Sequence, residues 1–313
     1  MTKNYELLII GAGPAGLAAG IYAARYGMKA AILERGICGG QIKDTPFIEN
    51  YLGLGKLGGA ELSEKMKKHA QQFIEIKEFY EVTEIEEISH KGNDYLYLVK
   101  TTQGDFNTKG LLFATGVGYK KLGVKGEEEY IGRGVSYCAT CDGFFFKEKK
   151  VAVVGGGSTA LTEAIYLSSI GCETHVIHRR GQHRAEKALV DMAKESGVKF
   201  IFNTVVEEIL GDGNFVKGLR IFNKETNEKT LFEIDGVFIA IGDKPNNLLS
   251  LSLGVEHDEK GYIKTDKEMR TSKKRVYAAG DITGGVRQVQ TAAAEGVVAT
   301  TTAYKEIKNP YWA

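Results

Sequence analysis

LLIIGAGPAG, at residues 7–16, is the stretch that decides the fold. An apolar run is followed by three glycines in the spacing G-x-G-x-x-G, namely Gly11, Gly13 and Gly16. In such a turn the first glycine permits a tight bend, the second lets a pyrophosphate approach the backbone, and the third lets helix and strand pack closely. A helix that begins here also directs amide donors and a positive dipole at a phosphate. The motif predicts a dinucleotide-binding turn.

The residues after this motif continue a β-α-β unit. A helical pattern runs to about Arg25, and a second apolar strand covers residues 30–33 and ends at Glu34. A carboxylate at this place can bind the two hydroxyls of a ribose. The motif alone also occurs in ordinary glycine-rich turns, but a strand, a helix and an acid at the expected separations favour nucleotide binding.

The same unit occurs a second time. VAVVGGGSTA, at residues 151–160, repeats the strand and the glycine turn, and Gly155 stands 144 positions after Gly11 (155 − 11). Ala160 replaces the third glycine, which the motif tolerates because only a small residue is needed there. The repeat indicates an internal duplication and a second nucleotide site, whose candidate turn residues are Gly155, Gly157, Ser158 and Thr159.

The two copies differ where their second strands end. His178, Arg179 and Arg180 stand in the second copy where the first has Glu34. A carboxylate repels a 2′-phosphate, whereas guanidinium groups bind it through paired, charge-assisted hydrogen bonds. The first copy therefore favours a nucleotide with a free ribose 2′-hydroxyl, and the second favours NADPH. A solvated basic turn is the alternative interpretation of the two arginines.

Two further apolar segments predict the domain layout. Residues 111–116 and 237–242 each end in a small-residue turn, and the whole second unit lies between them. We therefore expect an α/β fold with two Rossmann-like, three-layer dinucleotide-binding domains, the second inserted into the first. The first domain would comprise residues 1–117 and 246–313, and the second residues 118–245.

Composition limits the class of protein. The 313 residues hold 41 Lys and Arg against 40 Asp and Glu, and this balance carries no basic footprint for nucleic acid. No run approaches the ~18 apolar residues of a membrane span, and the N-terminus lacks a signal-peptide pattern. We expect a cytoplasmic protein that binds neither nucleic acid nor membrane.

Cys138 and Cys141 form a C-x-x-C pair shortly before the second glycine-rich strand. The two sulfurs can close a small disulfide loop, and nearby amides can stabilise one thiolate. Zinc is the main alternative, but the other cysteines and the six histidines repeat no ligand spacing, so we predict no metal. Asp142 could move a proton to or from a thiolate or a reduced flavin, although Asp142-Gly143 is also a common turn dipeptide.

Over essentially its whole length the sequence resembles the low-molecular-weight thioredoxin reductases of bacteria and archaea, which are pyridine nucleotide-disulfide oxidoreductases. The resemblance rests on both glycine motifs, the segment from Cys138 to Gly143, and shorter matches: Gly39-Gly40-Gln41, Glu49-Asn50-Tyr51, Ala114-Thr115-Gly116, His178-Arg179-Arg180 with Arg184, Gly280-Asp281, and Arg287-Gln288. It implies an FAD domain made from the two ends of the chain, an inserted NADPH domain that carries the disulfide, and a homodimer. Electrons would pass from NADPH through FAD and the disulfide to thioredoxin or a glutaredoxin-like protein.

The resemblance also implies the residues of each site. The catalytic residues would be Cys138, Cys141 and Asp142. FAD would be bound by Gly11, Gly13, Gly16, Glu34, Gly40, Gln41, Asn50, Ala114, Thr115, Gly116, Gly280, Asp281, Arg287, Gln288 and Val289. NADPH would be bound by Gly155, Gly157, Ser158, Thr159, His178, Arg179, Arg180, Arg184, Ile241 and Gly242.

Some features depart from the family pattern and leave other functions to be weighed. Ser158 stands where the family usually has Asn or Asp, and Thr162 stands where it often has Glu. Both differences bear on the affinity for the nicotinamide cofactor. Related enzymes that take electrons from ferredoxin or a deazaflavin have lost the arginines, so the arginines kept here argue for NADPH. A flavin dithiol oxidase or a non-catalytic flavin sensor would not need the second nucleotide site.

Overall fold

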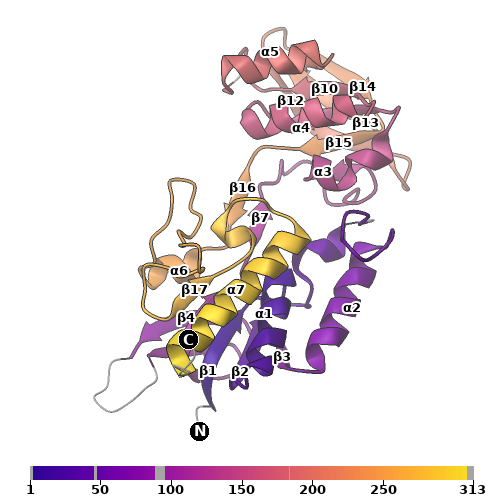
Figure 1. Ribbon diagram of the computed structural model, residues 1–313. Coiled ribbons are helices and arrows are strands. Elements are labelled where there is room, and N and C mark those ends of the chain that lie inside the picture. Colours follow the sequence, from indigo (N-terminus) through magenta and orange to yellow (C-terminus); the bar gives the residue numbers. More distant parts are fainter. Residues whose placement is uncertain (1–2, 46–47, 89–95, 183, 309–313) are drawn as a thin grey trace. The chain divides into compact units, whose positions relative to one another are not determined.

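The computed structural model describes residues 3–45, 48–88, 96–182 and 184–308. The chain divides into two compact units (Figure 1). Unit 1 comprises Met1–Lys43, Tyr51–Gly118 and Lys244–Ala313, and unit 2 comprises Asp44–Asn50 and Tyr119–Asp243. The described residues 44–45 and 48–50, which the sequence placed in the first domain, group with unit 2 in the structure.

Unit 1 is built on one mixed sheet. Its parallel strands lie in the order β3-β2-β1-β6, with β17 paired to one end of β6, and β5 and β4 continue the sheet antiparallel. The strands are β1 (Lys3–Ile10), β2 (Ala30–Glu34), β3 (Glu75–Glu78), β4 (Val82–Glu87), β5 (Tyr97–Thr101), β6 (Phe106–Phe113) and β17 (Val276–Ala278). Along β1 the side chains alternate between two cores: Leu7 and Ile9 pack with the helices, and Leu8 and Ile10 pack with β4 and β5.

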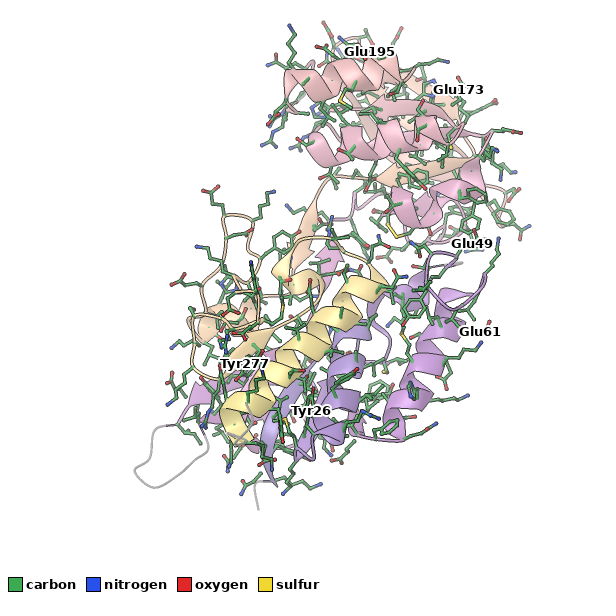
Figure 2. The ribbon with its side chains drawn as sticks, viewed as in Figure 1. Tyr26, Glu49, Glu61, Glu173, Glu195 and Tyr277 are labelled. Carbon is green, nitrogen blue, oxygen red and sulfur yellow. A yellow bond between two sulfur atoms is a disulfide. The ribbon has the colours of Figure 1, made fainter. Side chains whose placement is uncertain are left out.

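The helices of unit 1 are α1 (Pro14–Arg25), α2 (Gly59–Gln71), α6 (Leu248–Ser252) and α7 (Val289–Lys308), with 3-10 turns η1 (Gly40–Asp44) and η3 (Asp281–Thr283). Helix α7 runs alongside α1 (Figure 1). The approach is close, because a Cβ atom on Gly296 would lie 2.1 Å from the carbonyl oxygen of Ala15. Tyr26, labelled in Figure 2, stacks on Tyr304 of α7 with ring centroids 4.7 Å apart. The last part of the chain is thereby held on the first nucleotide-binding unit.

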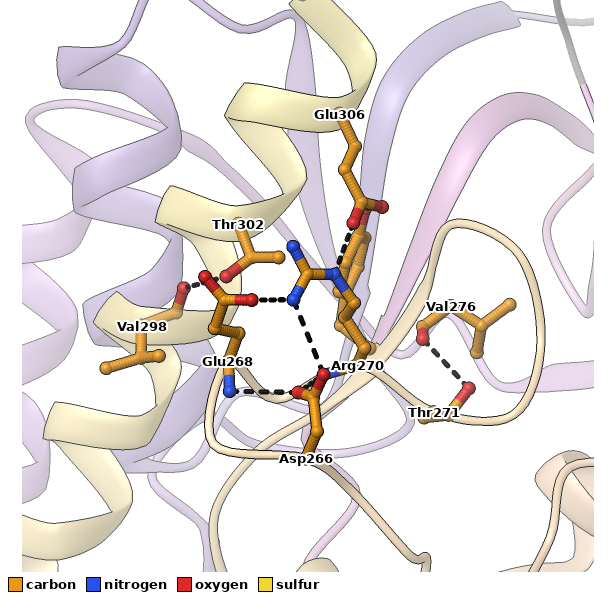
Figure 3. Close-up of polar contacts among 9 residues, drawn as sticks. Asp266, Glu268, Arg270, Thr271, Val276, Val298, Thr302 and Glu306 are labelled. Atoms are coloured by element: carbon orange, nitrogen blue, oxygen red, sulfur yellow. Dashed lines mark hydrogen bonds and ion pairs between the residues drawn. The ribbon is translucent and has the colours of Figure 1, made fainter. Parts of the chain in front are cut away.

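A charged network ties the loop before β17 to α7 (Figure 3). Arg270 donates to the carboxylates of Asp266, Glu268 and Glu306, and Glu306 also accepts the hydroxyl of Tyr277. Tyr277 is buried in the core of unit 1. Because Glu306 joins both the loop and β17 to α7, the network fixes β17, the strand that leads into Gly280.

Unit 2 has a parallel sheet in the order β11-β10-β9-β15-β8. Its strands are β8 (Val135–Ser136), β9 (Lys150–Val154), β10 (Glu173–Ile177), β11 (Lys199–Ile201) and β15 (Gly236–Ile239). Helices pack on one face: α3 (Ala139–Asp142), with the 3-10 turn η2 (Gly143–Phe146), α4 (Ser158–Ser169) and α5 (Lys187–Glu195). The other face packs on an antiparallel sheet of β12 (Thr204–Gly211), β13 (Val216–Asn223) and β14 (Lys229–Glu233).

Both units therefore confirm the predicted α/β fold with parallel, glycine-turn sheets. The chain crosses between the units through β7 (Val117–Tyr119) and β16 (Asp243–Pro245), which pair with each other. None of the helices in the described part of the chain has the length and apolar character that a membrane-spanning helix requires.

Candidate functional site

The glycine turn of unit 1 contains two crowded glycines and one open glycine. Gly11 has a φ of 106°, and its Cβ would lie 2.3 Å from the carbonyl oxygen of Ala114. A Cβ on Gly16 would lie 1.9 Å from the carbonyl oxygen of Gly11. At Gly13, by contrast, the nearest described atom to an added Cβ would be the Cα of Gly40, at 3.9 Å. Two glycines serve the protein's own packing, and the space beside Gly13 is left for a ligand that approaches the backbone.

The carboxylate of Glu34 closes this turn from the end of β2. One oxygen accepts the amide of Ala12 at 2.8 Å, and the other accepts the amide of Gly36 at 2.9 Å. Each carboxylate oxygen has a further lone pair, so Glu34 can fix the turn and still accept ribose hydroxyls. The sequence predicted the ribose role but not the two backbone bonds, because they depend on how the turn folds back on the strand.

The Gly280-Asp281 turn lies against the start of α1. Gly280 has a φ of 80°, and its Cβ would lie 3.0 Å from the Cβ of Ala15. Its amide donates to the carboxylate of Glu295 on α7, 2.7 Å away. Burial raises the pKa of Glu295, whereas the bonds from Gly280 and Thr283 act against that rise. The structure thus brings Asp281 to the glycine turn, and Glu295 is a supporting carboxylate that sequence reasoning missed.

The remaining predicted flavin residues are distributed unevenly. The side-chain amide of Gln41 donates to the carbonyl of Val117, and Thr115 exchanges two hydrogen bonds with Asn246, at 2.9 and 2.8 Å. Further predicted residues belong to the same unit, namely Gly40, Ala114, Gly116, Arg287, Gln288 and Val289. Asn50 is not grouped with them, because it is an exposed residue of the segment that belongs to unit 2.

The glycine turn of unit 2 repeats this division of labour. A Cβ on Gly155 would lie 2.4 Å from the carbonyl oxygen of Ala240, as Gly11 does beside Ala114. Gly157 has no described atom within 4 Å of such a Cβ, so the second glycine again faces open space. Ser158 and Thr159 begin α4, and Ile241 and Gly242 follow β15.

The end of β10 differs chemically from the end of β2. His178 is buried, and burial followed by the charges of Arg180 and Arg179 lowers its pKa. A Cβ on Gly156 would lie 2.1 Å from Nδ1 of His178, so the imidazole packs flat against the glycine turn. Arg184 joins the same turn, since its amide donates to the carbonyl of Gly156 at 2.8 Å. Arg179, Arg180 and Arg184 are exposed, so their guanidinium groups are available for an anion.

Cys138 and Cys141 form a disulfide at the start of α3 in unit 2, drawn with yellow sulfur atoms in Figure 2. The carbonyl of Cys138 accepts the amides of Cys141 and Asp142 at 3.2 and 3.1 Å, which closes the loop as a single helical turn. Among the described residues, no three His, Cys, Asp or Glu side chains gather as a metal site would require. The arrangement is that of a redox dithiol on a helix start.

Asp142 lies directly after the disulfide, and its two carboxylate oxygens have different surroundings. Oδ2 accepts the hydroxyl of Ser136 at 2.6 Å, while Oδ1 is buried with no hydrogen-bond partner among the described residues. Burial raises the pKa of Asp142 to about 6, although the Ser136 hydrogen bond acts in the opposite direction. A carboxylic acid with this pKa can carry a proton close to neutral pH.

The two other cysteines are buried thiols. Cys38 donates to the carbonyl of Ala12, and Cys172 donates to the carbonyl of Phe146. Burial raises the pKa of Cys38 to about 12 and that of Cys172 to about 11. Neither forms a thiolate readily at neutral pH, so the reactive sulfur chemistry of the chain lies in the disulfide.

Known proteins resemble the chain along nearly its whole length. The family model described as pyridine nucleotide-disulphide oxidoreductase matches residues 5–296. The thioredoxin reductase of Listeria monocytogenes is 40% identical over 308 residues, which is 98% of this chain and 95% of that protein. The thioredoxin reductase of Helicobacter pylori is 42% identical over 302 residues, covering 94% of this chain and 96% of the relative.

The solved structures agree with the sequence relatives. The crystal structure of thioredoxin reductase from Streptococcus pyogenes has a TM-score of 0.91 and 40% identity, covering 99% of this chain and all of the other (100%). Two glycine turns, a disulfide beside a buried acid, and this likeness point to the same conclusion. The chain belongs to the pyridine nucleotide-disulphide oxidoreductase family.

Proposed function

We propose that this chain is an NADPH-dependent thioredoxin-disulfide reductase that carries FAD. The observation that carries the proposal is the Cys138–Cys141 disulfide beside the buried acid Asp142, in the same unit as the second nucleotide turn. Relatives at 40% identity over nearly the full chain are named thioredoxin reductase.

The residues of both turns fit the two cofactors. In unit 1 the open face of Gly13 would admit the pyrophosphate of FAD, with Glu34 on the ribose and Asp281 on the hydroxyl-bearing chain of the flavin half. In unit 2 the open face of Gly157 would admit NADPH, with Arg179, Arg180 and Arg184 on its 2′-phosphate. Bound FAD supplies a carrier of two electrons between NADPH and a disulfide.

The chain's own residues account for the proton chemistry. Thiol–disulfide exchange needs one sulfur deprotonated for attack and the leaving sulfur protonated afterwards. Asp142, whose raised pKa lies near 6, is the acid we assign to that proton, and Cys138 and Cys141 are the exchanging sulfurs. The partner would be thioredoxin or a similar small dithiol protein; a homodimer and a cytoplasmic location stay predictions.

The proposal is tested by an anaerobic titration of the flavin-loaded protein. NADPH should bleach the flavin absorbance, and adding oxidised thioredoxin should restore it while free thiols form on thioredoxin. NADH, reduced ferredoxin and a reduced deazaflavin are compared as donors in separate titrations under the same conditions. A protein that takes up no FAD, or that is bleached by ferredoxin and not by NADPH, would refute the proposal.

A further inference from the structure

Ser136 makes the hydrogen bond that leaves Asp142 with one tied and one untied oxygen. Its hydroxyl donates to Oδ2 of Asp142 at 2.6 Å and accepts the amide of Cys138 at 3.1 Å. The same oxygen lies 3.4 Å from the carbonyl of Cys138. Ser136 is buried on β8, and its backbone is held by the pairing of β8 with β15. The hydroxyl is therefore fixed on both sides.

A serine hydroxyl has one proton and can donate it to one acceptor at a time. When Asp142 is ionised, the proton points to Oδ2, the shorter contact. When Asp142 is protonated on Oδ1, Oδ2 is still an acceptor, so the hydroxyl keeps donating to it rather than to the Cys138 carbonyl, which is 3.4 Å away. The contacts of Ser136 thus join Asp142 to the backbone of the disulfide loop.

From this geometry we propose that Ser136 is a positioning residue that ties Asp142 Oδ2, so that Oδ1 is the oxygen that delivers the proton during thiol–disulfide exchange. The inference rests on the proposed function of Asp142. In the step, one thiolate of the reduced pair attacks the target disulfide, a new S–S bond forms and the target S–S bond breaks. The leaving sulfur takes the electron pair of the broken bond and the proton from Oδ1, which leaves Asp142 ionised.

A cavity of about 290 Å³ lies beside Asp142. Both Ser136 and Asp142 line it. The other charged residues that line it are Arg133, Lys149, Lys217 and Asp235. None of these residues is altered in the variants below, so a change in titration is assigned to the hydroxyl.

The experiment measures the pH at which Asp142 titrates, with two independent readouts. Infrared difference spectra of the oxidised protein, with Asp142→Asn as reference, follow the carboxylic acid band. The rate of thioredoxin reduction between pH 5 and pH 9 follows the limb that falls as the acid ionises. Losing the hydrogen bond that favours the ionised form raises the pKa, so Ser136→Ala should move both midpoints up by about one pH unit.

Matched variants separate the hydroxyl from the change in volume. Ser136→Thr keeps the hydroxyl and should keep both midpoints near those of the unmodified protein. Ser136→Val has nearly the shape of threonine without the hydroxyl and should shift them as alanine does, which decides the matter if Ser136→Ala does not fold. Thr140→Ala is the control. It removes a hydroxyl that lies 3.4 Å from the sulfur of Cys138 and has no hydrogen bond to Asp142 in the described part of the chain, so it should shift neither midpoint.

The outcomes distinguish the two levels of the argument. If Asp142→Asn removes the limb but Ser136→Ala and Ser136→Val leave the infrared midpoint in place, the role of Ser136 is refuted and that of Asp142 stands. If Asp142→Asn leaves the rate and its limb unchanged, Asp142 is not the acid, and both assignments fail together.

Discussion

Units 1 and 2 each contain a glycine turn of the same kind, but the strand that follows it ends in different residues. In unit 1 the first glycine lies against Ala114, directly after β6, and in unit 2 it lies against Ala240, directly after β15. In both units the second glycine faces open space. In unit 1 the next strand ends in Glu34, whose carboxylate binds the turn's own amides. In unit 2 it ends in buried His178 followed by exposed arginines. From this comparison we infer that the turn provides for a pyrophosphate, whereas the strand end selects the nucleotide.

The largest effect is expected from the disulfide of unit 2, whose loss should stop turnover without affecting the flavin turn of unit 1. Cys138→Ser or Cys141→Ser should abolish thioredoxin reduction, because a single thiol cannot complete the exchange. NADPH should still bleach the flavin, since both nucleotide turns are intact. Rapid anaerobic mixing measures the bleaching, and a thioredoxin thiol assay measures the turnover. Turnover retained in either variant would contradict the assignment.

A matched pair of glycine variants should break one nucleotide site at a time. Gly13 and Gly157 both have extended backbone that valine can adopt, so Gly13→Val and Gly157→Val should fold. A side chain in the ligand space costs about 3 kcal/mol, or ~100-fold in affinity. Gly13→Val should lose FAD, and Gly157→Val should keep FAD but fail to respond to NADPH. Flavin content and NADPH titration check this, and loss of FAD in both variants would show that the sites are not separate.

Exchanging the strand-end chemistry of unit 2 should have a smaller effect. Arg179→Ala with Arg180→Ala should raise the KM for NADPH about 10- to 100-fold, the equivalent of one or two charge-assisted hydrogen bonds, with little change in kcat. The KM for NADH should change little, so the preference between the cofactors should shrink. Steady-state kinetics with both cofactors measure it. An unchanged ratio would favour a solvated basic turn.

The smallest effect concerns the buried acid of unit 2. Because burial raises the pKa of Asp142 to about 6, folding keeps its proton, and above that pH the native state holds a buried charge. Asp142→Asn should therefore stabilise the protein by about 1–2 kcal/mol at pH 8 and by roughly half as much at pH 5, because at pH 5 the unfolded state has already ionised above its pKa of 3.8. Thermal unfolding at the two pH values checks the sign. A gain in stability at pH 5 that equals the gain at pH 8 would exclude this cause.

Sequence spacing predicted what depends on local order along the chain. The glycine turns, Glu34 and the basic strand end follow from the β-α-β repeat, because turn, helix and strand must follow one another at fixed separations. The insertion of the second domain followed from the position of the second repeat between the apolar segments 111–116 and 237–242.

Contacts that depend on how distant segments meet were not predictable. The bond from Gly280 to Glu295 requires the position of α7 beside β17, and the fit of His178 against Gly156 requires the bend of the turn. Ser136 lies only six positions before Asp142, yet their contact depends on the loop that the disulfide closes. No residue pattern marks such pairs, since serine and glycine occur at many turns.

Binding of 2′,5′-ADP and of 5′-AMP to the flavin-loaded protein, compared by calorimetry, tests most directly whether the strand end selects the nucleotide. The two ligands differ by the 2′-phosphate that Arg179 and Arg180 would bind. We predict that 2′,5′-ADP binds about 10- to 100-fold more tightly than 5′-AMP, and that Arg179→Ala with Arg180→Ala removes the difference. Equal affinity of the unmodified protein for both ligands would contradict the account.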